Sequence, residues 1–517
     1  MNHITILYTG DIHANIERFL RLATLAYSQR YELTAVGRHV ILVDTGDAED
    51  RACLESDLTK GAAIYRLMRT AGYQAAVVGN GLLLAYGPQV LRGVSSASNI
   101  PLLCANVLTR DLHPTPLPGT SPTRIITCGT IRVGLIGLTT EIKDTYEQFY
   151  NLRVPNTIEM ARQQLHALRA QGCQVIGALS HLGYERDVEL AETVPELNFI
   201  IGGHSHARMA APRVIYGVPI CHAGDRARYL GRLDLTLDDH DKLVEWRGQI
   251  LSVHEDLPPH PAVSTAWESI QEDVARKLEQ EVTHLTAPAT LATDSACSLG
   301  QMAADALRER MHAQAAILVT GHFSGDLPEE AVTLGDMARA CPSTANAGAA
   351  EVTGAQLLRA LEYGADPDVW NRTPRAMNNN PVGILQVSGL RYRLNPSAPF
   401  GQRVSDVEIE GEPVQPDALY VVAATDFELM PRRGYFPDMN LEDVTLDVTR
   451  VLREVLQDYL RRQSVNTPPD EPRILRREAA IERIPEPPTS PDDTPRPHKT
   501  QPLGDILRQV PRRPPDQ

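Results

Sequence analysis

Seven side chains that can bind divalent metal ions occur in the first half of the chain, each shortly after a run of apolar residues. They are Asp11, His13, Asp47, Asn80, His181, His204 and His206. Carboxylate, imidazole and amide donors together suit a pair of divalent ions, which can activate water and neutralise charge on a phosphoryl group. The set therefore predicts a two-metal hydrolase, with Asp47 as the carboxylate that both ions share.

The spacing of the donors supports convergence on one pocket. Asp11 and His13 are separated by one residue, and so are His204 and His206. In an extended segment, residues two apart point to the same side, so Asp11 and His13 can reach one ion, and His204 and His206 can point into a common pocket. Glycines beside most of the donors let the backbone turn tightly.

The elements that must position these donors are buried strands. Apolar runs alternate with helical patterns, which favours an α/β or α/β-sandwich architecture. The expected strands are Ile4–Thr9, Val40–Asp44, Ala75–Gly79, Ile131–Leu138, Val175–Ser180 and Phe199–Gly202. Ligand sites in open sheets gather at the carboxyl ends of strands, and the donors lie there.

Length and composition exclude several functions. The 517 residues exceed a single core, and the formal charge of −15 argues against binding a nucleic-acid polymer through its backbone. We expect a cytoplasmic protein that does not act at a membrane, because no signal-peptide pattern and no long apolar segment is present. The seven cysteines are widely spaced without a CxxC pair, as reduced buried thiols would be.

Composition divides the chain into four regions. We expect a catalytic domain at residues 1–255, a linker helix at 256–284, a second α/β domain at 285–462 and a disordered proline-rich tail at 463–517. The second domain should contain helices at Ser298–His312 and Thr353–Glu362, and strands at Ala315–Thr320, Ile384–Val387 and Tyr420–Ala424. Two tail segments, Ile474–Ile484 and Leu503–Val510, keep apolar residues at helical spacing, which leaves a protein partner open although an unstructured tail is the simpler reading.

The motifs around the donors resemble the 5′-nucleotidase family of calcineurin-like metallophosphoesterases, which includes UDP-sugar hydrolases and 2′,3′-cyclic-nucleotide phosphodiesterases. The similar segments are Ile6–His13, Val43–Asp47, Val78–Asn80, Cys104–Val107, Leu179–Gly183, Ile201–His206, Ser298–Leu307, Val352–Leu358 and Leu385–Leu390. The resemblance implies a four-layered α-β-β-α sandwich followed by a smaller α/β substrate-binding domain.

The resemblance also implies which donors hold which ion. Asp11, His13, Asp47 and His206 would bind one divalent ion, and Asp47, Asn80, His181 and His204 would bind the other. Zinc, manganese or a similar metal is the expected cofactor. The expected partner is a small-molecule phosphoester or nucleotide.

The chain departs from the family at its catalytic dyad. The family continues from the asparagine ligand into a histidine that stabilises the transition state, helped by an aspartate, whereas this chain has Gly81 and Leu84 there. Such a positioned group is typically worth about 10²–10⁴-fold in rate. Either another histidine, His222 or His322, fills the gap, or hydrolysis is slow or absent.

The second domain departs as well. The family grips phosphate with an arginine in a segment that here reads Val319–Gly325, without Lys or Arg. Phe427 matches one of two aromatic rings that sandwich a nucleobase, but Ile384 stands at the other position. Arg432 and Arg433 replace a glycine-rich acidic segment, where they would either meet an anionic group or lie in a solvated loop.

Three hypotheses follow for function. The first is a phosphoesterase that hydrolyses nucleotides or related phosphoesters by metal-bound hydroxide, with activity attenuated by loss of the dyad. The second is an inactive ligand-binding or scaffold protein that retained the fold and metal site. The third is hydrolysis of a cyclic-nucleotide or sulfate ester on the same scaffold.

Overall fold

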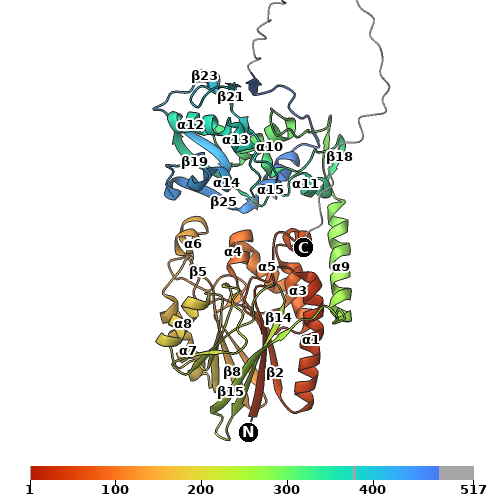
Figure 1. Cartoon of the computed structure of the whole chain (residues 1–517), viewed down its shortest axis with the longest axis vertical. Coiled ribbons are helices and arrows are strands. Elements are labelled where there is room, and N and C mark those ends of the chain that lie inside the picture. The colour runs from red at the N-terminus through yellow and green to blue at the C-terminus, as the bar shows by residue number, and fades with distance from the viewer. Residues whose placement is uncertain (1, 375–376, 378–379, 477–517) are drawn as a thin grey trace, which may run out of the picture. The chain divides into compact units, whose positions relative to one another are not determined.

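The computed structural model describes residues 2–374, 377 and 380–476, and its N-terminal part is built on two facing sheets (Figure 1). The first sheet has seven strands, in the order β15 (Leu243–Ser252), β14 (Tyr229–Leu237), β1 (Asn2–Thr9), β2 (His39–Asp44), β3 (Ala75–Val77), β4 (Leu102–Leu103) and β6 (Thr120–Ser121). The second has six strands, in the order β12 (Arg213–Ile215), β13 (Val218–His222), β11 (Phe199–Gly202), β10 (Val175–Ser180), β8 (Ile131–Leu138) and β7 (Thr123–Cys128). The six strands expected from the sequence are all present.

Alternation of side chains along the strands separates two layers of core. Ile4, Ile6 and Tyr8 of β1 pack with residues of both sheets, whereas Leu7 faces the helices on the outer side. Successive side chains of a strand point to opposite faces, so each sheet is covered on both sides. The outer helices are α1 (Ile16–Ala35), α3 (Ala62–Ala71) and α5 (Leu91–Ser98) on the first sheet, and α7 (Thr157–Ala170) and α8 (Tyr184–Thr193) on the second. The N-terminal domain is therefore the expected α-β-β-α sandwich.

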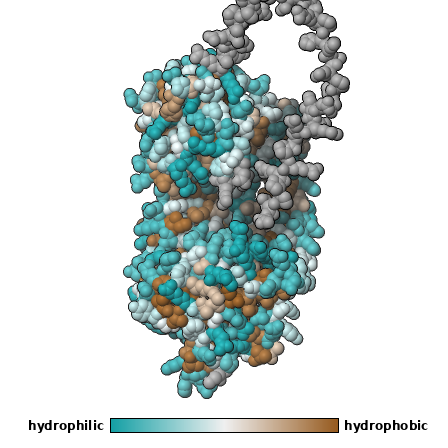
Figure 2. All heavy atoms as spheres, in the orientation of Figure 1, coloured by the Kyte–Doolittle hydropathy of each residue, from teal (hydrophilic) through white to brown (hydrophobic). Residues whose placement is uncertain are grey.

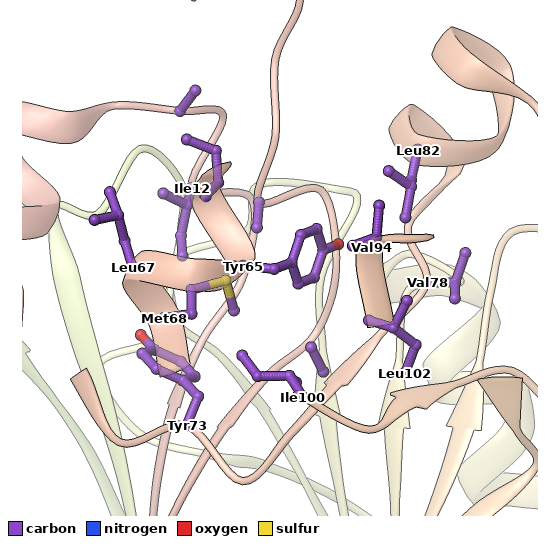
Figure 3. Packing of buried hydrophobic residues seen from close by; sticks show 14 of the residues in the cluster. Ile12, Tyr65, Leu67, Met68, Tyr73, Val78, Leu82, Val94, Ile100 and Leu102 are labelled. Atoms are coloured by element: carbon purple, nitrogen blue, oxygen red, sulfur yellow. The ribbon is translucent and has the colours of Figure 1, made fainter. Parts of the chain in front are cut away.

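The core beneath the first sheet's helices is tightly filled (Figure 3). Tyr65 and Met68 of α3 are fully buried, and Figure 3 shows Tyr65 between Met68 and Val94. The hydroxyl of Tyr65 is not left unpaired, because it donates to Glu49 at 3.0 Å. This hydrogen bond links the core directly to the loop that follows β2. Short elements complete the domain: α2 (Leu54–Leu58), α4 (Asn80–Tyr86), α6 (Lys143–Phe149), and the paired strands β5 (Leu108–Thr109) and β9 (Leu152–Arg153).

The linker helix, α9, spans Pro261–Leu278 and lies within the segment expected to connect the domains. Its proline occupies the first turn, where the missing N–H costs no hydrogen bond. Val263, Ile270 and Val274 are its buried face and join the core of the N-terminal domain.

The C-terminal region is built around a five-stranded sheet. Its strands, in order, are β20 (Leu385–Ser388), β17 (Ala315–Val319), β24 (Leu419–Thr425), β19 (Asn346–Thr353) and β25 (Val444–Val451). Two smaller sheets have the orders β18 (Glu330–Thr333), β16 (Glu281–Leu285), β26 (Val465–Asn466), and β23 (Glu412–Pro413), β22 (Val404–Ile409), β21 (Leu390–Leu394), β27 (Ile474–Arg476). The helices are α10 (Ser298–Arg310), α11 (Leu334–Ala340), α12 (Gly354–Gly364), α13 (Pro367–Trp370), α14 (Asp426–Leu429) and α15 (Leu452–Leu460).

The ordered chain continues past the expected start of the tail. β26 pairs with β16, and β27 pairs with β21, so the prediction of disorder from residue 463 is wrong for these strands. Arg473 explains part of the difference, because its guanidinium forms two hydrogen bonds of 2.8 Å with the carboxylate of Asp305. Composition alone does not reveal this pairing. Of the two apolar tail segments, Ile474–Ile484 is described only to residue 476, where it forms a strand, and Leu503–Val510 lies outside the described residues.

Hydrophobic residues on the face drawn in Figure 2 are scattered among hydrophilic ones. None of the helices in the described part of the chain is both long and apolar enough to cross a membrane.

Candidate metal centre

Six of the seven predicted metal ligands form two clusters. The donor atoms of Asp11, His13 and His206 all lie within 4.8 Å of one another, and so do those of Asp47, His181 and His204. Asn80 joins the second cluster, because its Oδ1 lies 3.2 Å from Nε2 of His181. The structure thus brings together all seven residues that the sequence singled out.

Parallel strands position the first two loops. β1 and β2 are hydrogen-bonded in parallel, so both end at the same edge of the sheet. Beyond the strands, the N–H of Asp11 donates to Gly46 O at 2.9 Å, and that of His13 donates to Asp47 O at 3.0 Å. These bonds hold the two ligand loops side by side.

The backbone of the site is strained. Five of the seven predicted ligands have positive φ angles: Asp11 (53°), His13 (47°), Asp47 (51°), His204 (69°) and His206 (54°). Residues other than glycine rarely adopt this conformation, and it persists only where the surrounding structure enforces it. Such strain is typical of functional sites, and here it aims side chains of neighbouring loops at one place.

Imidazole nitrogens face each other across the first cluster. Nε2 of His13 and Nε2 of His206 lie 3.1 Å apart, and Nε2 of His206 lies 3.5 Å from a carboxylate oxygen of Asp11. The carboxylate of Asp11 is buried and also accepts from the N–H of His204 at 3.0 Å, whereas His206 is exposed. In this cluster the carboxylate of Asp11 is therefore buried, and the imidazole of His206 is open to solvent.

His181 is oriented for coordination through Nε2. Its Nδ1 lies 2.8 Å from the carbonyl oxygen of Thr45, a contact that requires a proton on Nδ1, so Nε2 is the atom that would bind a metal ion once it has lost its own proton. Nε2 lies 3.2 Å from the carboxylate of Asp47. Burial lowers the pKa of His181, but the Asp47 carboxylate outweighs it and raises the pKa to about 9 in the metal-free protein.

The pKa values of the two buried carboxylates, Asp47 and Asp11, are shifted in opposite directions. Burial would raise the pKa of Asp47, but the His181 imidazole and the N–H of Gly81 lower it to about 2. Burial, reinforced by the negative charge of Asp47, raises the pKa of Asp11. A concentration of buried acids and imidazoles with few cations suits divalent ions, and the donor set fits them chemically.

Glu49 is a site residue that the sequence reasoning missed. Its side chain is only 3 % exposed, Oε2 accepts from Tyr65, and Oε1 has no hydrogen-bond partner among the described residues. Burial and the charge of Asp47 raise its pKa to about 8. Nothing in the spacing of Asp47 and Glu49 marks the second carboxylate, because its role depends on the neighbouring Gly81.

Glu49 lies next to Gly81, the position at which the family has its histidine. The atoms nearest to a Cβ built on Gly81 belong to Asp47 and Glu49, at 2.9 Å and 3.1 Å. Neither His222 nor His322 contributes one of the atoms nearest to that point. Leu84, at the position of the family's aspartate, lies one turn further along α4 and is partly buried.

His222 instead belongs to a buried network behind the second cluster. Its Nε2 lies 2.9 Å from the carboxylate of Asp187, which also accepts a hydrogen bond from the hydroxyl of Ser180. Ser180 directly precedes His181, so this network supports the end of β10. His322 lies in the C-terminal region, where Nε2 is 3.2 Å from Glu428 and Nδ1 is 2.7 Å from Ser343.

The predicted substrate contacts of the C-terminal domain are only partly present. Phe427 lines a pocket, but Ile384 is fully buried in the core and offers no surface to a ligand. One face of the Phe427 ring carries the guanidinium of Arg433, whose central carbon is 4.6 Å from the ring centroid. The two-ring sandwich expected from the family is therefore absent from these positions.

Comparisons with known proteins agree with this architecture. Residues 280–439 match the model of the 5′-nucleotidase C-terminal domain. An uncharacterized metallophosphoesterase of Bacillus subtilis is 21 % identical, with 82 % of this chain and 92 % of the relative covered. The snake venom 5′-nucleotidase of Naja atra is 23 % identical, covering 91 % of this chain and 98 % of the relative.

A solved structure extends the likeness to the fold. The NAD nucleotidase of Haemophilus influenzae matches with a TM-score of 0.58 at 16 % identity, covering 92 % of this chain and 99 % of that one. An α-β-β-α sandwich with paired donor clusters, followed by a smaller α/β domain, defines a metallophosphoesterase architecture. Residues 280–439 thus correspond to a 5′-nucleotidase C-terminal domain, and over most of its length the chain is similar to proteins named as metallophosphoesterases and 5′-nucleotidases, which are hydrolases.

Proposed function

We propose that the protein is a two-metal hydrolase of small phosphoesters. The observation that carries this proposal is the convergence of seven donors on one edge of the sandwich, with five of them held at positive φ. Strain of this kind has a cost of order 1–3 kcal/mol per residue, so a site that keeps it in five ligands is built for a purpose.

The donors divide between two ions in this proposal. Asp11, His13 and His206 would hold one ion, Asn80, His181 and His204 would hold the other, and Asp47 would contact both. When bound, divalent ions would supply a water nucleophile at neutral pH and neutralise charge on the phosphoryl oxygens.

The residues around the donors determine which phosphoesters the site would hydrolyse best. Thr45 fixes the His181 ring, and the exposed His204 and His206 leave the phosphoryl group an open approach. Gly81 and Leu84 provide no acid to protonate a departing alkoxide. We therefore expect a preference for substrates with good leaving groups, which need less protonation.

Nucleotides are the first substrates to test, because relatives of the chain include named 5′-nucleotidases. The purified protein would be loaded with Mn²⁺, Zn²⁺ or Co²⁺, its metal content measured, and its activity followed on p-nitrophenyl phosphate and a nucleotide panel. Two bound ions and metal-dependent turnover are expected. Turnover that survives complete removal of metal, or no turnover on any substrate, would overturn the proposal.

The same assay distinguishes the proposed hydrolase from an inactive binding protein, a hypothesis motivated by Gly81 at the position of the family's histidine. That hypothesis predicts thermal stabilisation by a nucleotide without turnover under every metal condition. The cytoplasmic location stays a prediction from the sequence.

A further inference from the structure

A pocket lined mainly by the C-terminal domain combines the ring of Phe427 with several polar side chains, and Phe149 and Tyr150 of the N-terminal domain also line it. Its lining includes His322, Ser343, Asn346, Phe427, Arg432 and Arg433. We call it the Phe427 pocket. Leu84, which also lines it, lies four residues after the predicted ligand Asn80 on α4.

Hydrogen bonds at the start of α14 and the ring of His322 hold Phe427 in place. Thr425 and Glu428 form a capping box at the start of α14, and the N–H of Phe427 donates to Oγ1 of Thr425 at 3.1 Å. The His322 ring meets Phe427 edge-on, with centroids 6.0 Å apart. Because Glu428 is itself anchored by the N–H of Val319 at 3.0 Å, the ring has a defined position.

Arg433 covers one face of this ring. Its guanidinium stacks at 4.6 Å from the centroid, an arrangement that leaves the N–H donors at its edge available. The turn that presents it ends at Gly434, which has φ of +93° and lies against the ring of Tyr363. A Cβ on Gly434 would stand 2.6 Å from that ring, so the glycine fixes the path of the loop.

Apart from the contact of Arg433 with the Phe427 ring, the two arginines of the pocket have no partner among the described residues. Within the part of the chain that the structure describes, the guanidinium groups of Arg432 and Arg433 form no hydrogen bond or ion pair. Asp426, the acid among the lining residues, accepts instead from the N–H and the side-chain amide of Asn346, at 3.2 and 3.0 Å. Two uncompensated cations beside an apolar ring suit a carboxylate or phosphate, which a guanidinium binds with two parallel hydrogen bonds.

The pocket also contains an unused acceptor. Oδ1 of Asn346 is buried and has no hydrogen-bond partner in the described structure. A buried polar group of this kind costs free energy unless a ligand or water satisfies it. A ligand with both an anionic group and a hydrogen-bond donor would satisfy both sides of the pocket.

We propose that the Phe427 pocket is a specificity site for a second anionic group, carried by the alcohol part of the phosphoester and contacted by Arg433. A nucleobase would have to displace Arg433 from Phe427 or stack on the guanidinium instead. The substrate class is then an acidic phosphoester, bearing a carboxylate or second phosphate, and not a simple nucleoside monophosphate. This inference rests on the proposed phosphoesterase function.

Matched aryl phosphates test the inference. The metal-loaded full chain would be assayed on phenyl phosphate, 4-carbamoylphenyl phosphate, 4-carboxyphenyl phosphate, 1,4-phenylene bisphosphate and AMP. The carboxylate and its neutral amide isostere have nearly the same shape. We expect kcat/KM to favour the carboxylate over the amide by about tenfold, and the bisphosphate arm shows whether phosphate is preferred to carboxylate.

Variants assign the preference to the arginine. Arg433→Met keeps an unbranched side chain over Phe427 without the charge and should reduce the carboxylate-to-amide ratio to about one. Arg433→Lys keeps the charge without the planar fork and should leave an intermediate ratio. Arg391→Met, an exposed arginine on β21 of the same domain, is the matched control and should leave the ratio unchanged.

A non-hydrolysable ligand separates this inference from the proposed function. Titration with 4-(phosphonomethyl)benzoate should show binding that weakens about tenfold in Arg433→Met. If no ester is hydrolysed but this Arg433-dependent binding remains, the pocket assignment stands while the phosphoesterase proposal falls. If esters are hydrolysed with a wild-type ratio near one, or AMP is the best substrate, the anionic specificity site is overturned and hydrolysis stands.

Discussion

The unpartnered Oε1 of Glu49 lies 3.1 Å from the point at which a Cβ on Gly81 would stand. Oδ1 of Asp47 lies closer still to that point, at 2.9 Å, and accepts a hydrogen bond from the N–H of Gly81 at 2.7 Å. A side chain at residue 81 would therefore crowd the carboxylates of both Asp47 and Glu49. Placing the family's histidine at residue 81 would disturb Glu49.

Gly81→Ala should weaken metal binding while leaving the fold intact. The added methyl would push on the Asp47 carboxylate, so we expect about tenfold lower metal affinity, equivalent to roughly 1.4 kcal/mol. Helix propensity acts the other way, since alanine is better than glycine by up to about 1 kcal/mol within a helix. Competition with a chromophoric chelator would measure affinity, and thermal unfolding of the metal-free protein would measure stability.

Gly93→Ala is the matched control for this substitution. Gly93 also lies in a helix, α5, and a Cβ there would meet nothing within 4 Å. It should give the stability gain without a change in affinity. Equal metal affinities for both variants and the wild type would contradict the crowding of Asp47.

A rebuilt histidine and aspartate dyad should work only when Glu49 is shortened. Residues 81 and 84 are three apart on α4, so side chains there can meet on one face. We expect Glu49→Ala combined with Gly81→His and Leu84→Asp to accelerate hydrolysis of phosphoesters with poor leaving groups by at least about tenfold, part of the ~10²–10⁴ that such groups typically contribute. Gly81→His with Leu84→Asp alone should not, and equal rates for the two variants would show that Glu49 does not obstruct the histidine.

The strands and donors were predictable because local sequence determines them. Val175–Ser180 and Phe199–Gly202 are apolar runs that stop at polar residues, and the structure ends β10 and β11 at the same positions. Contacts between distant segments were not predictable in this way. Glu49 matters because of Gly81, and Arg433 matters because its chain turns back over Phe427, and neither relationship has a periodicity in the sequence.

Glu49→Gln should change how the stability of the metal-free protein depends on pH. Burial and Asp47 raise the pKa of Glu49 from 4.5 to about 8 in the folded protein. Between these values the folded state keeps a proton that the unfolded chain releases, so stability falls as pH rises and the loss is complete above about pH 8. Glutamine has no proton to lose, so its advantage over wild type should grow to a few kcal/mol across this window.

Urea denaturation of both proteins in chelator, at about pH 5 and about pH 8, would measure that difference. Asp44, whose pKa burial raises to about 7, acts in the same direction but is present in both proteins and cancels. Glu351→Gln, at an exposed position on β19, is the control and should show a constant difference. A parallel pH dependence of wild type and Glu49→Gln would rule out the buried acid as the cause.

Metal uptake should release a proton from His181 at neutral pH. The Asp47 carboxylate, overcoming the effect of burial, raises the pKa of His181 from 6.5 to about 9, so the metal-free imidazole carries a proton that Nε2 must lose to coordinate an ion. The stabilising charge pair is fully present below pH 6.5 and is lost as the pH rises through about 9. Apparent metal affinity should therefore rise about tenfold per pH unit up to that value, and calorimetric titration in buffers of different ionisation enthalpy should detect the proton.

His181→Asn should release about one proton fewer, whereas His166→Asn, at an exposed position on α7, should behave as wild type. Affinity that does not change with pH would mean that Nε2 is already free, and that Asp47 does not hold a proton on His181.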